Sequence, residues 1–94
     1  MNLQEFEQSL KQVSAPSEIS ESALALWWDA KGEWEQAHRI AQDINNATGA
    51  WIHAYLHRKE GDLGNAGYWY SRAGRPVCQD SLEEEWRVLV ESIL

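Results

Sequence analysis

Two short stretches decide the fold of this chain, GEWEQA at residues 32–37 and GDLGNA at residues 61–66. Each stretch begins with a glycine and an acidic residue, and each continues into a run with the periodicity of an α-helix. The two glycines are 29 residues apart, so the sequence can be aligned with itself at this offset. Aligned in this way, the chain contains the same unit of helix, turn and helix twice.

The self-alignment pairs apolar residues along the second helix of each unit. The pairs are Trp34 with Leu63, Ala37 with Ala66, Ile40 with Trp69, Ala41 with Tyr70, and Ile44 with Ala73. Their spacing of three and four residues places them on one face of a helix. Because the paired alanines are small, we expect the two helices of each unit to approach each other closely.

The two turns also carry a family resemblance. Residues 32–37 and 61–66 resemble the turn and second-helix start of tetratricopeptide and Sel1-like repeats, and WYSRA at residues 69–73 is similar to the end of that helix. The resemblance covers residues 18–76 and implies tandem helical hairpins whose inner surface binds peptides. The chain departs from the family in its offset of 29 residues, against about 34, and in having two copies. Residues 53–76 also resemble a segment of small uncharacterised bacterial proteins, which implies no activity.

Further helix signals lie outside the second helices of the repeats. Asn2 and Glu5 have the spacing of a capping box, and the first helix is expected to place four apolar residues on one face: Leu3, Phe6, Leu10 and Val13. The stretch around Pro16 ends it, and a second helix is expected to begin at Ser17 or the next residue and to end at Gly32.

The later helices have start signals of their own. Helices are expected at residues 33–45, 48–59 and 62–73, the last of these capped by Asp62. The final helix has two possible caps, Asp80 with Glu83 or Ser81 with Glu84, and is expected to turn inward Leu82, Trp86, Leu89, Val90 and Ile93.

These signals predict one all-α domain of about six helices over residues 1–94, because no run alternates as a β-strand does. We expect an N-terminal capping helix, two tandem hairpins of the tetratricopeptide kind and a C-terminal helix, over residues 1–16, 17–46, 47–76 and 77–94.

Composition narrows the range of partners. The chain has 94 residues, six of them tryptophan, and a net charge of −7, so its surface repels nucleic acids and anionic lipids. Its first residues have neither the basic nor the apolar region of a signal sequence, and no apolar run reaches about 18 residues, so we expect a cytoplasmic protein that binds neither nucleic acid nor membrane. No motif predicts a cofactor, and with a single cysteine, Cys78, an intrachain disulfide is excluded.

The histidines are one candidate site. His53 and His57 are four residues apart on one expected helix, and His38 lies on the helix before it. Two imidazoles at this spacing can share a metal ion if a third ligand converges on them. The self-alignment places His53 and His57 on apolar positions of the first unit, which favours packing and hydrogen bonding over metal binding. A metal site completed by an acidic side chain of a neighbouring helix is the alternative.

The second candidate site is a group of three residues on the fourth expected helix. Trp51, Tyr55 and Arg58 share one face, and an aromatic pair with a guanidinium is a common composition of binding hot spots. This face is expected to line the inner surface of the repeats. The alternative is that the three residues pack against a terminal helix.

The sequence therefore predicts a protein- or peptide-interaction module that binds its partner through Trp51, Tyr55 and Arg58. One alternative is a small-molecule or metal-binding protein that uses His53 and His57. Another is a subunit of a homo-oligomer, such as a homodimer, whose apolar faces are covered by self-association. No catalytic motif is present, so nothing in the sequence predicts an enzyme.

Overall fold

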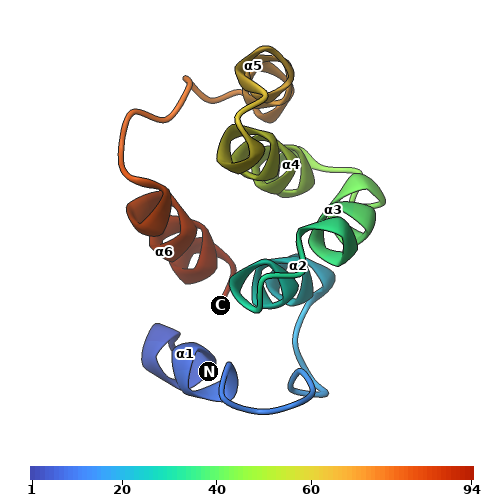
Figure 1. Cartoon of the computed structure of the whole chain (residues 1–94), viewed down its shortest axis with the longest axis vertical. Coiled ribbons are helices and arrows are strands. Elements are labelled where there is room, and N and C mark those ends of the chain that lie inside the picture. The colour runs from blue at the N-terminus through green and yellow to red at the C-terminus, as the bar shows by residue number, and fades with distance from the viewer.

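The chain folds into six helices and contains no strand, as the sequence predicts (Figure 1). The structure is a computed structural model that describes all of residues 1–94. The helices are α1 (Leu3–Ser9), α2 (Glu21–Ala30), α3 (Trp34–Gln42), α4 (Ala47–Glu60), α5 (Leu63–Ala73) and α6 (Leu82–Ile93). None of these helices is long and apolar enough to cross a bilayer.

The two repeated units form helical hairpins, α2 with α3 and α4 with α5 (Figure 1). Each turn depends on its glycine, because Gly32 and Gly61 adopt left-handed backbone angles, with φ of 84° and 90°. The residue after each glycine donates its backbone N–H to the carbonyl five residues earlier, at 2.9 Å in both turns. The turns are thus equivalent in geometry as well as in sequence.

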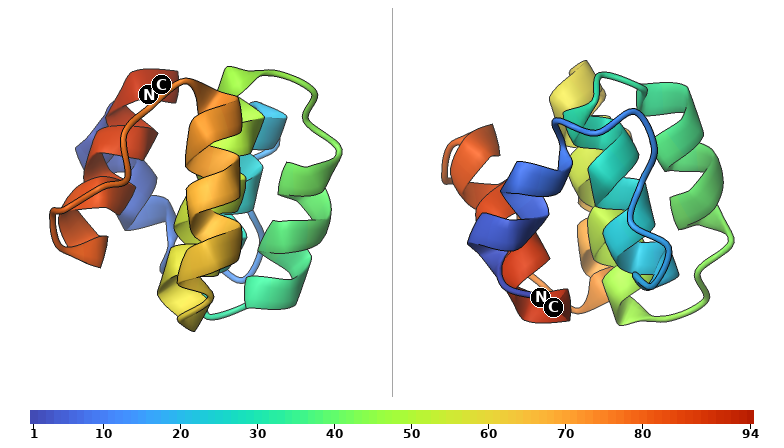
Figure 2. Two further views of the ribbon diagram at one scale, coloured as in Figure 1. Left: turned by 90° about the horizontal axis from the view of Figure 1, so that it is seen from above. Right: turned by 90° about the horizontal axis from the view of Figure 1, so that it is seen from below.

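The two terminal helices cover the inner side of the hairpins. α6 packs against α2 and α4, and α1 packs against α6, while α5 packs against α4 alone (Figures 1 and 2). The two ends of the chain lie side by side in every view (Figure 2). A single core of 16 buried residues contains side chains from all six helices.

Small residues allow the hairpin helices to approach closely. Ala25 and Ala54, which the 29-residue offset pairs, are both completely buried, as is Ala37 of α3. At the start of α4, Gly49 lies directly against Ile44, so that a Cβ at this position would be 2.7 Å from the Ile44 Cβ. Glycine at position 49 is required by this contact rather than by a turn.

Most of the expected helix ends are confirmed. Asn2 and Glu5 form the capping box, Asp62 caps α5, and Ser81 rather than Asp80 caps α6. The five residues expected to face inward from the last helix all belong to the core or pack against it.

The expected end of the first helix is wrong. α1 ends at Ser9, and Val13 is 96% exposed instead of facing the core. The Ser9 hydroxyl donates to the Phe6 carbonyl and accepts a hydrogen bond from Trp27 Nε1, which fixes the chain where it leaves the helix. Lys31 Nζ then donates to two carbonyls, those of Leu10 and Gln12, which the ended helix leaves without partners.

Two further expectations differ from the structure. α2 begins after Ser20, which caps it by accepting from the Ala23 N–H, rather than at Ser17. Leu63, which the self-alignment pairs with a half-buried Trp34, is 69% exposed. Leu63 is exposed because α5 is the outermost helix of the two hairpins, and no third hairpin covers its outer side.

Replacement of Gly49 by alanine tests the close approach of α4 to the preceding loop. We expect Gly49→Ala to lower the free energy of unfolding by about 3 kcal/mol, because its Cβ overlaps Ile44. The matched control is Gly64→Ala, a helical position where an added Cβ meets nothing within 4 Å. That variant should gain about 0.5–1 kcal/mol from helix propensity. Urea unfolding followed by circular dichroism measures both, and equal stabilities of the two variants would contradict the packing described.

Candidate functional site

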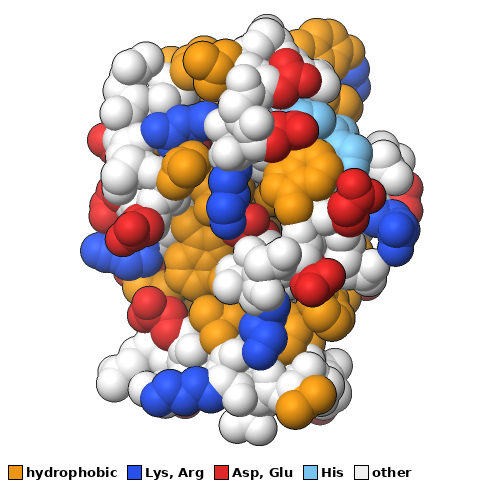
Figure 3. Space-filling view, in the orientation of Figure 1, with side chains coloured by type: hydrophobic (Ala, Val, Ile, Leu, Met, Phe, Trp, Pro, Cys, Tyr) orange, Lys and Arg blue, Asp and Glu red, His pale blue; other side chains and the backbone are white.

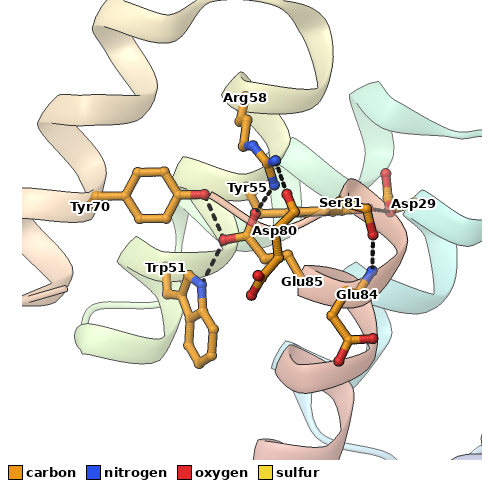
Figure 4. Close-up of polar contacts among 9 residues, drawn as sticks. All are labelled: Asp29, Trp51, Tyr55, Arg58, Tyr70, Asp80, Ser81, Glu84 and Glu85. Carbon is orange, nitrogen blue, oxygen red and sulfur yellow. Dashed lines mark hydrogen bonds and ion pairs between the residues drawn. The ribbon is translucent and has the colours of Figure 1, made fainter. Parts of the chain in front are cut away.

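The three residues predicted to bind a partner lie on the face of α4 that packs against α6 (Figure 4). Trp51 and Tyr55 are buried, and Arg58 is half-buried. All three use their polar atoms inside the protein, on carboxylates of neighbouring helices. The packing against a terminal helix that the sequence left open as an alternative is therefore present.

The carboxylate of Glu85 joins this face to α6. Glu85 is 2% exposed and accepts three hydrogen bonds: at Oε2 from Trp51 Nε1 at 3.0 Å and from the Tyr70 hydroxyl at 2.6 Å, and at Oε1 from Arg58 Nη1 at 2.8 Å (Figure 4). Arg58 also donates to the Asp80 carbonyl, which holds the segment leading into α6. A buried carboxylate is tolerated here because a cation and two neutral donors surround it.

Glu85 is not among the site residues that the sequence predicts. It lies in a run of three glutamates at the start of α6, where acidic residues commonly interact with the helix dipole. The available signal is its spacing, three residues after Leu82 and four before Leu89, which places it on the apolar face of the helix.

A second buried carboxylate holds the C-terminal half of α4. Asp29 of α2 accepts from the Tyr55 hydroxyl at 3.2 Å and from Lys59 Nζ at 2.9 Å. Burial, reinforced by the charge of Asp29, raises the pKa of Tyr55, and burial with the hydrogen bond to Glu85 raises that of Tyr70. Burial also raises the pKa of the Cys78 thiol. None of these groups is activated as a base or nucleophile.

A groove of about 870 Å³ lies beside this face. It lies where α1, the ends of α2 and α4, and the start of α6 meet, and apolar side chains are visible between charged ones on this side of the molecule (Figure 3). Leu10, Leu82 and Trp86 are half-buried and line it, with Tyr55 buried beneath them. Trp86 is held in place by its Nε1, which donates to the Leu26 carbonyl at 3.2 Å.

The charged residues of the groove are mostly acidic. Four carboxylates and two cations line it: Glu7, Asp29, Glu83, Glu84, Lys59 and Arg87. Both cations already have partners, since Lys59 pairs with Asp29 at 2.9 Å and Arg87 with Glu84 at 3.3 Å. Glu7 and Glu83 form no ion pair, so the groove has an excess of negative charge.

The third feature is a cluster of histidines. His53 and His57 are 6% and 7% exposed on α4, and His38 of α3 reaches them, with its Nε2 2.9 Å from the Nε2 of His53. His57 Nδ1 lies 2.7 Å from Glu60 Oε2. Trp69 stacks on the His53 ring at 3.9 Å between centroids, and Trp34 stacks on the His38 ring at 4.9 Å. The structure thus brings together all three histidines of the chain.

The environment of His38 and His53 favours their neutral rings. Burial, together with the nearby His38 and His57, lowers the pKa of His53 from 6.5 to about 4. Burial also lowers the pKa of His38. In the hydrogen bond between the two Nε2 atoms, one ring donates its single proton and the other accepts it.

A scan against protein-family models and searches of curated proteins and of solved structures find no match to this chain. The relation to tetratricopeptide and Sel1-like repeats therefore remains an interpretation of the sequence.

Removal of the Glu85 charge tests the hydrogen bonds that its buried carboxylate accepts. We expect Glu85→Gln to lower the free energy of unfolding by about 3 kcal/mol, because Arg58 loses its charged partner and the amide N–H group faces other donors. Glu84→Gln changes the neighbouring residue in the same way but breaks only an exposed ion pair, so its cost should stay below about 1 kcal/mol. Chemical denaturation at pH 7 measures both, and a small effect at position 85 would contradict the role given to its carboxylate.

The lowered pKa of His53 predicts a loss of stability in acid. Between pH 6.5 and 4 the unfolded chain binds a proton at this residue and the folded chain does not, so stability falls as the pH falls. From pH 7 to pH 5 the loss due to His53 should be about 2 kcal/mol. Urea unfolding of wild-type and His53→Phe protein at both pH values, with a chelator present, isolates this contribution. Equal pH dependence of the two proteins would show that His53 does not titrate as described.

Proposed function

We propose that the protein is an interaction module whose groove between α1, α2, α4 and α6 binds a short segment of a partner protein. In this segment, basic side chains flank apolar ones. The observation that carries the proposal is the groove itself, a hollow of about 870 Å³ with an apolar floor and unpaired carboxylates. A concave apolar site with a few polar groups around it is the usual form of a binding site.

The floor of the groove favours an apolar anchor in the bound segment. Leu10, Leu82 and Trp86 are only half-buried, so a partner side chain placed on them removes further apolar surface from water. Trp86 is already fixed by its hydrogen bond to the Leu26 carbonyl, and little side-chain entropy is lost when it is covered.

The charge of the groove favours basic residues beside that anchor. Glu7 and Glu83 have no cationic partner within the chain, whereas Lys59 and Arg87 are already paired with Asp29 and Glu84. The net charge of −7 attracts a basic segment over a longer range and repels a second copy of the same chain. This favours a partner of opposite charge over the homo-oligomer alternative.

The three residues predicted from the sequence, Trp51, Tyr55 and Arg58, have different roles in this proposal. Tyr55 lines the groove from below. Trp51 and Arg58 support it indirectly, because their hydrogen bonds to Glu85 hold the start of α6, which forms one wall. The proposal does not require either of these two residues to contact the partner.

Selection from a random peptide display library tests the proposal. Peptides selected by the wild-type protein should combine Lys or Arg with apolar residues, and their affinity should fall with rising salt. Glu7→Gln with Glu83→Gln should weaken the binding of such a peptide about three- to tenfold, because two unpaired carboxylates are removed.

The matched control is Glu18→Gln with Glu91→Gln, which removes the same charge from exposed positions outside the groove. This variant should bind almost as the wild type does. Equal losses in both double variants would mean that only the overall charge matters, and selected peptides without basic residues would contradict the proposed partner chemistry.

A further inference from the structure

The histidine cluster has the composition and spacing of a metal site. His38, His53 and His57 each offer a ring nitrogen, and these atoms all lie within 4.8 Å of one another. The cluster joins two helices of different hairpins, since His38 belongs to α3 and the other two to α4. We propose that these three residues bind one divalent transition-metal ion of the kind that prefers imidazole, zinc foremost.

The distances are close to those that a bound ion requires. Zinc binds imidazole nitrogen at 2.0–2.1 Å, so two nitrogens on a tetrahedral ion are about 3.3 Å apart. The Nε2 atoms of His38 and His53 are 2.9 Å apart and must separate by only about 0.4 Å. A ring nitrogen of His57 completes a set of three ligand atoms, one from each histidine, that all lie within 4.8 Å of one another. A tilt of the His57 ring, about a torsion that is broad for histidine, brings this nitrogen closer.

Glu60 sets the orientation of His57. A carboxylate only accepts hydrogen bonds, so the contact of 2.7 Å between Glu60 Oε2 and His57 Nδ1 places the ring proton on Nδ1. The lone pair of His57 Nε2 is then free, and no hydrogen bond within the chain engages that atom. A carboxylate behind a ligating histidine is the common outer partner in zinc sites.

The other two rings bind without a net loss of protons. In the metal-free cluster one proton is shared between the Nε2 atoms of His38 and His53. When the ion takes both nitrogens, the donor ring keeps its proton on Nδ1 instead, and each ring remains a neutral imidazole. The ion therefore replaces a single hydrogen bond with two metal–nitrogen bonds.

Aromatic stacking positions the ligands. Trp34 lies almost parallel to the His38 ring, at 11°, and Trp69 to the His53 ring, at 13°. These stacks restrict the rings before an ion arrives, which reduces the ordering cost of binding. His38 is half-buried and provides the side from which an ion and a fourth ligand, such as water, reach the cluster.

The metal site is independent of the proposed peptide groove. None of the three histidines lines that groove, and Glu60 does not line it either. A second set of possible ligands, His57 with Glu60 and Asp62, shares one histidine, but both of its carboxylates are exposed and Asp62 already caps α5. The three-histidine set has the greater burial and the fixed rings.

Titration of the untagged, chelator-treated protein with Zn²⁺ tests the proposal. Calorimetry should give one saturable site per chain, and Co²⁺ should give the intense visible absorption of a tetrahedral complex. Trp34 and Trp69 touch the ligand rings, so their fluorescence should change in step with saturation. His38→Gln and His53→Gln should each abolish the stoichiometric site.

Two further variants keep the test decisive if a histidine variant fails to fold. Glu60→Gln alters an exposed residue whose side chain hydrogen-bonds to His57, and it should weaken Zn²⁺ binding about ten- to a hundredfold. Glu91→Gln removes an exposed carboxylate far from the cluster and should leave the affinity unchanged. Absence of a one-to-one site, or an affinity unaffected by Glu60→Gln, would overturn the proposal.

Discussion

The carboxylate of Glu85 is the constraint on which the arrangement of the terminal helices depends. It meets donors from α4 and α5 in the interior, so α6 has to lie across the inner side of the second hairpin with its start beside Arg58. Asp29 makes the corresponding connection from α2 to Tyr55 and Lys59 in the C-terminal half of α4. α4 is consequently held to both α2 and α6 by ion pairs to buried carboxylates, and it is the helix around which the others are organised.

This arrangement changes what the hairpins present to solvent. In an open array of helical hairpins the inner surface is available for a ligand. Here α6 occupies much of that surface, and the accessible hollow is displaced to the place where α6 begins and α1 crosses it. The two hairpins set the layers of the fold, whereas the terminal helices determine where this hollow lies.

Much of the fold follows from local sequence. The glycine turns, the caps at Asn2 and Asp62 and the inward face of the last helix depend on residues a few positions apart, and these predictions are confirmed. The end of α1 depends on Trp27 and Lys31, which are distant in sequence, and that prediction is wrong. The site residues illustrate the same limit: periodicity assigns Trp51 to a face, but only the fold shows that Glu85 lies opposite it, or that His38 reaches His53.

The exposed outer side of α5 has a consequence for motion. This helix packs on α4 alone, with Tyr70 as its connection to α6, so its detachment breaks fewer interactions than that of α2 or α4. Opening of this kind is local unfolding, and its free energy lies below that of the whole domain. Because Trp69 leaves the His53 ring when α5 detaches, such an opening brings the histidines into contact with water.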